Sequence, residues 1–431
     1  MKSDRKREMA RKALFFLLTL LLALFVLEVS LRFLVKPSPV CFGTLLGGEL
    51  PPFVIAPDRM AEIEKETHTP AWEASKTEIA LRKRSRAPLN WSPEDLRSIH
   101  REDKTLGYVP QENSTSPHGW WHANNMGARS SRDCGREKPR GKKRILLFGD
   151  SFTHCCRVPL EETWPYMLEE KSTSLEALNF AVEGYGTAQC YLRYMKLKKE
   201  LDYDAAALVT VPGCDLERDI NTYRILIGWQ APNIMPRFLL KNQELVLIKS
   251  PYAGKEQFIA ENRGHISETL RKHLCAYDSF YIPVKYESPP LLGSLISYKL
   301  IARSYFTGHE NSLRTNIFDP TREAVKVTGE IIKAMRREVK GDRKDFILFF
   351  LPIHDEIRRY KKEPAFRKRW DNAISALAGR DLQPVDLMKP LSELDESSID
   401  TGYDGSHYGP VMNSIITGHV ESALKNIKII P

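Results

Sequence analysis

The chain has 431 residues, of which 42% are hydrophobic and 28% are charged, a globular composition that excludes wholesale disorder. The formal net charge is +9, but residues 1–12 carry six basic and two acidic side chains, which leaves only +5 on the other 419 residues. Nucleic-acid binders gather basic residues on one face, so this dilute charge predicts no nucleic-acid partner.

An apolar segment, residues 13–35, follows the basic flank directly. About 20 apolar residues cross a bilayer as a helix, and no small-residue cleavage site follows the run. The pattern predicts a signal-anchor with residues 1–12 in the cytoplasm, and a cleavable signal peptide is the alternative. Basic flanks stay inside, so the rest of the chain is expected to be extracytoplasmic, in the periplasm or at the cell surface. Glu28 and Arg32 lie four residues apart and can neutralise each other where the helix leaves the hydrocarbon.

Residues 36–102 predict a linker followed by a polar helical segment. The stretch 36–57 contains five prolines, which is typical of a linker. Residues 58–100 are charged and polar with a partly helical pattern. From residue 103 the chain turns to short aromatic and Gly/Asn-rich pieces, which predict strands and turns at the edge of a domain that extends to residue 431.

Five short apolar runs then alternate with helical patterns, at 144–150, 177–182, 205–213, 345–354 and 384–388. Continuous apolar strands separated by helices predict a parallel sheet that is covered on both faces. In such sheets the ligand site lies beyond the carboxyl ends of the strands. Residues 221–321 interrupt the alternation and predict an insertion, with a hairpin at 237–248 whose turn is expected at Lys241-Asn242.

Two motifs at the ends of this domain carry the candidate chemistry. Ser151, in Gly149-Asp150-Ser151, comes where the first apolar run gives way to a helix, so free backbone N–H groups can hold a charged oxygen there. The alternative is that Asp150 and Ser151 only cap that helix. Asp404 and His407 are spaced so that the carboxylate can orient the imidazole and leave its other nitrogen free to act as a base.

These motifs, in this order, resemble the SGNH/GDSL hydrolase family over residues 140–431. RILLFGDSFT is similar to the family's first block, NFAVEGYGTAQ to its second and DGSHYGP to its last, with a further match upstream in Asn125-x-Gly127-x-Arg129. The resemblance implies a flavodoxin-like three-layer α/β/α sandwich with a five-stranded parallel sheet. It also implies a catalytic triad of Ser151, Asp404 and His407.

The same resemblance implies an oxyanion hole built from the backbone N–H groups of Ser151 and Gly184, with Gly186 as the second choice for the glycine. In the third block Cys214 stands where the family usually has an asparagine. A thiol is a weak donor, and losing one oxyanion donor typically costs about 3 kcal/mol. Asn221 is a candidate replacement.

Two other histidines are alternative bases: His154, three residues after the serine, and His354, at the end of the fourth apolar run. No GxSxG elbow occurs, which argues against the α/β-hydrolase fold. The seven cysteines lack a CxxC pair and clustered histidines, so no metal site is predicted, and their spacing does not specify disulfides.

The resemblance therefore implies a membrane-anchored serine esterase that cleaves carboxylic esters, on envelope carbohydrate or on lipid, without a metal or an organic cofactor. Two alternatives remain open. One is an O-acyltransferase of the same fold that acts on cell-envelope polysaccharide. The other is a catalytically inactive binding protein.

Overall fold

The computed structural model describes residues 2–56, 99–116, 119–228, 233–402 and 405–431. These residues form two compact units. Unit 1 comprises residues 2–56, 262–267 and 281–313, and unit 2 comprises the other described residues. Residues 57–98, which cover most of the predicted polar helical segment, and the predicted triad residue Asp404 lie outside the described residues.

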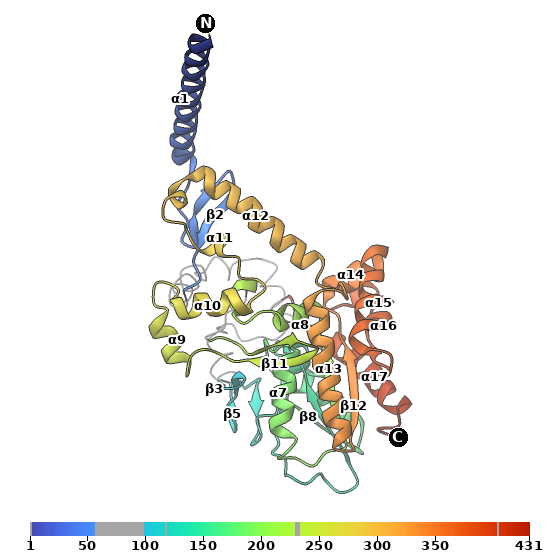
Figure 1. The fold of residues 1–431 in the computed structure, drawn as a ribbon. Helices are drawn as coiled ribbons and strands as arrows, with labels where there is room; N and C mark the ends of the chain where they lie inside the picture. Colours follow the sequence, from blue (N-terminus) through green and yellow to red (C-terminus); the bar gives the residue numbers. More distant parts are fainter. Residues whose placement is uncertain (1, 57–98, 117–118, 229–232, 403–404) are drawn as a thin grey trace. The chain divides into compact units, whose positions relative to one another are not determined.

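Unit 1 begins with the long helix α1 (Lys2–Leu34), which contains the predicted apolar segment (Figure 1). Its part Arg7–Leu34 is long and apolar enough to cross a membrane, although an N-terminal signal sequence would meet the same criterion. The other elements of the unit are β1 (Cys41–Leu45), β2 (Gly48–Phe53), α11 (Pro283–Tyr286), η3 (Leu292–Ser294) and α12 (Ile296–Thr315).

The antiparallel hairpin β1–β2 corrects the expectation of a linker at 36–57. Its Leu45 and Leu50 are buried against Ile296 of α12, and Leu31 near the end of α1 packs on the same cluster. Ile296 lies about 250 residues further along the chain than the hairpin. A linker pattern rich in proline cannot reveal such partners, because it reports only local backbone preference.

Unit 2 is built on a five-stranded parallel sheet with the strand order β13-β12-β9-β7-β8. Its strands are β7 (Lys143–Phe148), β8 (Leu175–Asn179), β9 (Ala205–Thr210), β12 (Asp345–Phe350) and β13 (Val385–Asp386). Each corresponds to one of the five predicted apolar runs. The central strand β9 is buried along its whole length, as expected for a sheet that is covered on both faces.

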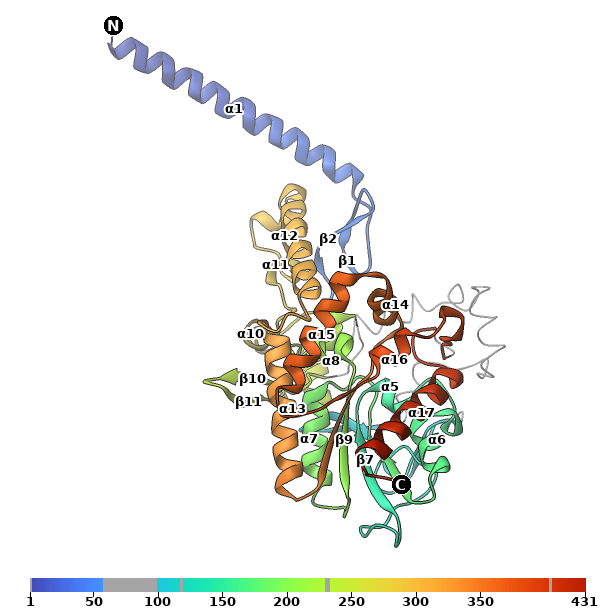
Figure 2. The same ribbon diagram turned by 90° about the vertical axis from the view of Figure 1, so that its right-hand side faces the viewer.

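Helices lie on both faces of this sheet, as Figure 2 shows. The pair α6 (Trp164–Lys171) and α17 (Pro410–Asn426) pack together on one face, and α7 (Thr187–Leu197), α13 (Glu323–Gly341) and α15 (Pro364–Ala378) pack together on the other. In α13 the fully buried Val327, Ile331 and Met335 recur every four residues, which gives the helix one apolar face. The predicted three-layer α/β/α sandwich is therefore confirmed.

Unit 2 also contains shorter strands and helices, some of which precede the sheet in sequence and others of which connect its main elements. Strands β4 (Gly107–Pro110), β5 (Ser114–Thr115) and β6 (His122–Ala123) lie in the stretch where strands and turns were predicted ahead of the core. Strand β3 (His100–Asp103) begins inside the segment that was predicted to be polar and helical. The remaining elements are α5 (Ser151–His154), η1 (Leu160–Glu162), α8 (Pro212–Asp219), η2 (Arg224–Ile227), α9 (Lys255–Glu261), α10 (Glu268–Tyr277), α14 (His354–Lys362), α16 (Met388–Ser392) and η4 (Glu396–Ser398).

The predicted hairpin at 237–248 is present as β10 (Arg237–Lys241) and β11 (Glu244–Ile248). Its turn is formed by Asn242 and Gln243, one residue later than predicted, because Lys241 still pairs with Glu244. Both turn residues have positive φ, +51° and +66°, which is the geometry that twisted two-residue hairpin turns require. The expected turn at Lys241-Asn242 was wrong by one position, since apolar alternation does not show where positive φ falls.

Candidate active site

The structure brings Ser151 and His407 into contact, although 256 residues separate them. Ser151 begins α5 directly after β7, and its Oγ lies 2.9 Å from Nε2 of His407. This is the distance at which a base can take a proton from a hydroxyl nucleophile. Ser151 has no exposed surface and His407 is 5% exposed.

The ring of His407 is held on both of its other sides. Its Nδ1 lies 3.0 Å from Oγ of Ser406, and the ring of Phe152 packs against the imidazole at a centroid distance of 4.6 Å. Phe152 directly follows the serine, so the same single-turn helix carries the hydroxyl and the ring that supports its partner. Asp404, which was predicted to orient this imidazole, lies outside the described residues.

His354, predicted as an alternative base, faces the loop that carries His407 and not the serine. Its two ring nitrogens each lie 3.2 Å from a backbone carbonyl, those of Asp400 and Ser406. Burial lowers the pKa of His354 below its usual value. The carboxylate of Asp400 in turn accepts the N–H groups of Val411 and Met412 at the start of α17. His354 therefore helps to hold the loop in place.

Helix α5, which begins at Ser151, is fixed at its N-terminus by Asp150. One carboxylate oxygen accepts the N–H of Phe152 at 2.9 Å, and the other accepts a hydrogen bond from the guanidinium of Arg218 at 2.8 Å. Arg218 also lies 3.2 Å from Asp215, and all three side chains are buried. The capping role that the sequence allowed for Asp150 is thus present together with the serine–histidine contact.

Arg129, the last residue of the upstream Asn-x-Gly-x-Arg match, fixes the other end of α5. Its buried guanidinium donates to the carbonyls of His154, Cys155 and Val158, the last two at 2.7 Å. Burial lowers the pKa of Arg129 to about 10, which leaves it charged at neutral pH. His154 packs against the ring of Trp121 at 5.0 Å, so this second alternative base belongs to the support of α5.

Among the described residues, no acceptor is found for the backbone N–H groups of Ser151 and Gly184. Gly184 has a φ of +77°, which favours glycine. The N–H of Gly186, the second choice, is directed to the side chain of Gln189 at 3.4 Å. Of the two glycines, only Gly184 therefore keeps its N–H without an acceptor among the described residues.

Neither residue considered for the third donor position is well suited to it. Burial raises the pKa of Cys214 well above its usual value, so the side chain remains a neutral thiol, which is a weak donor. Asn221 already uses its side-chain amide, which donates to the carbonyl of Tyr223 and to Asp278. The amide of Asn221 is therefore not available to replace the missing asparagine, because it is already hydrogen-bonded within the insertion.

Glu356 is a site-edge residue that the sequence did not indicate. It lies at the start of α14, is 3% exposed, and accepts the N–H of Ile353 at 2.8 Å. A Cβ placed on Gly213 would lie 2.1 Å from its Oε1, so a larger residue there would displace this carboxylate. Burial raises the pKa of Glu356 to about 8. No local pattern could have found this contact, because Gly213 and Glu356 are brought together only by neighbouring strands.

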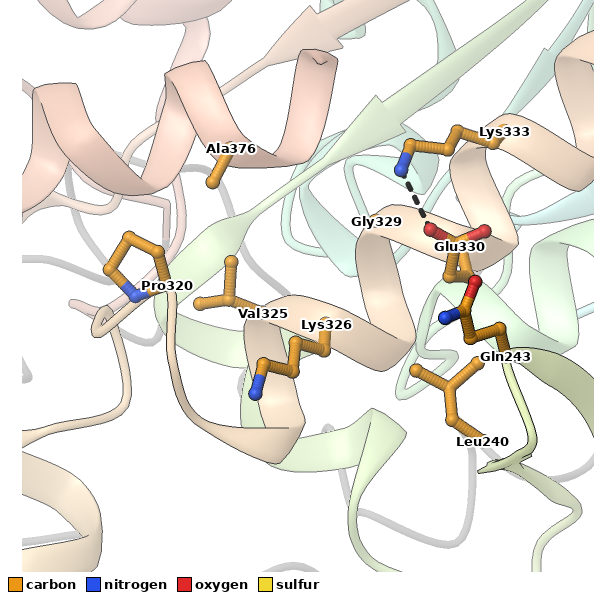
Figure 3. A pocket seen from close by; sticks show the side chains of 9 residues that line it. All are labelled: Leu240, Gln243, Pro320, Val325, Lys326, Gly329, Glu330, Lys333 and Ala376. Carbon is orange, nitrogen blue, oxygen red and sulfur yellow. Dashed lines mark hydrogen bonds and ion pairs between the residues drawn. The ribbon is translucent and has the colours of Figure 1, made fainter.

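A separate cavity of about 330 Å³ lies between the β10–β11 hairpin, α13 and α15 (Figure 3). It is lined by Leu240, Gln243, Pro320, Val325, Lys326, Gly329, Glu330, Lys333 and Ala376. The ammonium of Lys333 donates a hydrogen bond of 2.6 Å to the carboxylate of Glu330. None of the lining residues belongs to the cluster around Ser151. Within the described ranges, no group of three or more His, Cys, Asp or Glu side chains could hold a metal ion.

No protein-family model and no curated protein matches the sequence. Solved structures do match it, among them a lipase/acylhydrolase from Enterococcus faecalis at 12% identity, covering 66% of this chain and 96% of that chain with a TM-score of 0.32. A member of the lipolytic G-D-S-L family from Veillonella parvula matches at 10% identity, covering 66% and 98% with a TM-score of 0.33. The psychrotrophic esterase EstA from Pseudoalteromonas sp. matches at 9% identity, covering 67% and 100% with a TM-score of 0.31.

Proposed function

We propose that this protein is a serine esterase that cleaves carboxylic esters, with Ser151 as the nucleophile and His407 as the general base. The observation that carries the proposal is the 2.9 Å contact between Oγ of Ser151 and Nε2 of His407 at the carboxyl edge of a parallel sheet. That edge is where ligands bind in open α/β sheets. The proposed catalytic domain extends from residue 103 to residue 431.

The reaction proceeds in two steps of acyl transfer. His407 takes the proton of Ser151 as Oγ attacks the ester carbonyl, and the carbonyl oxygen becomes an oxyanion held by the N–H groups of Ser151 and Gly184. His407 then gives the proton to the leaving alcohol. Water, activated by the same imidazole, attacks the acyl-enzyme and releases the acid. No step in this sequence needs a metal or an organic cofactor.

Asp404 is proposed to stabilise the imidazolium from the Nδ1 side, as the third member of the triad. Cys214 is proposed to occupy the third oxyanion position. Because its thiol donates weakly, the two backbone N–H groups carry most of the stabilisation, and we expect slow turnover compared with an enzyme that has an asparagine there.

The decisive experiment uses a fluorophosphonate probe, which forms a covalent bond with an activated serine. The full-length protein should be labelled, and Ser151→Ala should abolish labelling. The matched control Ser422→Ala, on the exposed face of α17, should label like the wild type. Labelling that survives in Ser151→Ala would place the nucleophile elsewhere, and no labelling of the wild type would support an inactive binding protein.

The acyl acceptor separates the esterase from the O-acyltransferase. Wild-type protein is given p-nitrophenyl acetate with and without an oligosaccharide acceptor, and the acetylated products are identified by mass spectrometry. The esterase predicts free acetate in both mixtures. Acetylated oligosaccharide that depends on Ser151 would instead establish the transferase, for which the weak donor at Cys214 is the motivating observation.

We further propose that α1 anchors the protein as a single-pass membrane helix with the catalytic domain outside the cytoplasm. The supporting observations are the length and apolar character of residues 7–34 and the basic flank before them. An ester of envelope carbohydrate or lipid is the substrate class that this location favours. A periplasmic reporter enzyme fused after residue 60 should be active, and activity of a cytoplasmic reporter at the same position would reverse the orientation.

A further inference from the structure

The hydroxyl of Tyr108 contacts the loop that carries the candidate oxyanion glycine. Tyr108 lies on β4, and its Oη donates a hydrogen bond of 2.5 Å to the backbone carbonyl of Glu183. The contact is close, since a Cβ added to Gly184 would lie 2.7 Å from the same Oη. A hairpin that precedes the core domain in sequence therefore reaches the second strand's carboxyl end.

The carbonyl of Glu183 and the N–H of Gly184 belong to one planar peptide unit. In a trans peptide these two groups point in opposite directions, so whatever fixes the oxygen also fixes the direction of the N–H. The N–H of Gly184 has no acceptor among the described residues that could hold it. Gly184 has positive φ and lacks a Cβ, so rotation of this peptide meets little steric resistance. The N–H of Tyr185 closes the surrounding turn on the carbonyl of Val182 at 3.2 Å, but such a turn accepts either orientation of its central peptide. The Tyr108 hydrogen bond is made directly to the oxygen of that peptide and so selects its orientation.

Tyr108 is itself held by several contacts. It pairs with Glu102 in the β3–β4 ladder, and the hydroxyl of Tyr185 donates to its backbone carbonyl. The rings of Tyr108 and Tyr185 pack edge to face at 5.5 Å. Burial of the hydroxyl raises the pKa of Tyr108 above its usual value, so it remains a donor throughout the physiological range.

We propose that Tyr108 is a positioning residue that orients the Gly184 N–H toward the oxyanion formed at Ser151. This rests on the proposed esterase function. A hydrogen bond to a peptide carbonyl also polarises the N–H of the same unit, which makes it a stronger donor. Tyr108 contributes most when negative charge develops on the substrate oxygen, so its loss should lower kcat and leave KM nearly unchanged.

The test compares Tyr108→Phe with Tyr203→Phe in the full-length protein. Both remove only a hydroxyl, and Tyr203 is a suitable control because its buried hydroxyl is hydrogen-bonded to that of Tyr194 at 2.9 Å, outside the described site. Turnover of p-nitrophenyl acetate, the rate of fluorophosphonate labelling and the melting temperature are measured for each. Tyr108→Phe should lower kcat and the labelling rate about 10-fold, less than the loss of a whole oxyanion donor. Tyr203→Phe should lose comparable thermal stability and keep both rates.

The outcomes separate this proposal from the esterase itself. A wild type that lacks Ser151-dependent turnover and labelling overturns both. An active wild type for which Tyr108→Phe keeps its kcat, or raises only KM, overturns the positioning role and leaves the esterase intact. If both tyrosine variants lose rate in proportion to stability, Tyr108 is structural. A Tyr108→Phe protein that fails to fold, beside a folded Tyr203→Phe, also overturns the proposal.

Discussion

Asp150 in unit 2 and Glu28 in unit 1 both accept backbone N–H groups at the start of a helix, but in different surroundings. Asp150 accepts the N–H of Phe152 in the first turn of its own helix, whereas Glu28 accepts the N–H groups of Ile296 and Ser297 from a helix 268 residues further along. An arginine lies beside each carboxylate. Arg218 has a side chain that is only 1% exposed, 2.8 Å from Asp150.

The second arginine, Arg32, is 55% exposed and lies 3.6 Å from Glu28. A buried ion pair leaves an uncompensated charge when one partner is removed, while an exposed pair is replaced by solvent. We therefore expect the Arg218–Asp150 pair to contribute more to stability than the Arg32–Glu28 pair. In the second pair only the arginine is exposed, and the buried Glu28 keeps the N–H groups of Ile296 and Ser297 when Arg32 is removed. Two predictions test that difference, and a third tests Glu356, a buried carboxylate of unit 2 that forms no such ion pair with an arginine among the described residues.

The largest effect is expected for Arg218→Met, which leaves the carboxylates of Asp150 and Asp215 buried without their cation. The free energy of unfolding should fall by about 3–5 kcal/mol, measured by urea denaturation. Arg32→Met, the matched change in unit 1, should cost less than about 1 kcal/mol. Similar small losses in both variants would show that burial does not distinguish the two pairs.

An intermediate effect concerns the pH dependence that Glu356 imposes on unit 2. Its pKa is raised from 4.5 to about 8 by burial, so the folded state binds a proton that the unfolded state releases above about pH 5. The resulting stability is fully present below pH 4.5 and is lost as pH rises through 8, by up to about 1.4 kcal/mol per pH unit.

Glu356→Gln should remove this slope, because the amide stays neutral at every pH. Unfolding free energies at pH 5, 7 and 9 measure it. The control Glu330→Gln, at a partly exposed carboxylate of α13, should keep the wild-type slope. If Glu356→Gln and the wild type have parallel pH profiles, Glu356 is ionised in the folded protein.

The smallest of the three effects is expected at Glu28, where the carboxylate acts as a cap supplied by another helix. Glu28→Ala removes the acceptor for two N–H groups of α12 and should cost about 1–2 kcal/mol. The rate of hydrogen exchange at residues 296–300 should increase in Glu28→Ala. In Glu28→Gln, which retains one acceptor oxygen, the exchange rate should lie between those of the wild type and Glu28→Ala. Fluorophosphonate labelling of Ser151 should not change. Unaltered exchange in Glu28→Ala would mean that apolar packing of Leu31 alone holds the helix.

Features that depend on local pattern could be predicted from the amino-acid sequence. Five continuous apolar runs predicted the five parallel strands, the apolar segment predicted α1, and the position of Ser151 after a strand predicted the start of α5. These features follow from burial, hydrophobic periodicity and helix capping, which act over a few neighbouring residues. The motif resemblance added His407 as the partner of Ser151, and the two side chains meet at 2.9 Å.

Contacts between distant segments depend on the packed fold and could not be predicted from local pattern. Residues 41–53 form a hairpin and not a linker because Ile296 and α1 supply its apolar partners. The side chain of Asn221 is held within the insertion by its hydrogen bond to Asp278. The contacts of Glu356 with Gly213 and of Tyr108 with Glu183 likewise join different strand ends. No local period encodes such pairs, since they arise when separate elements pack and each buried polar group must find a partner.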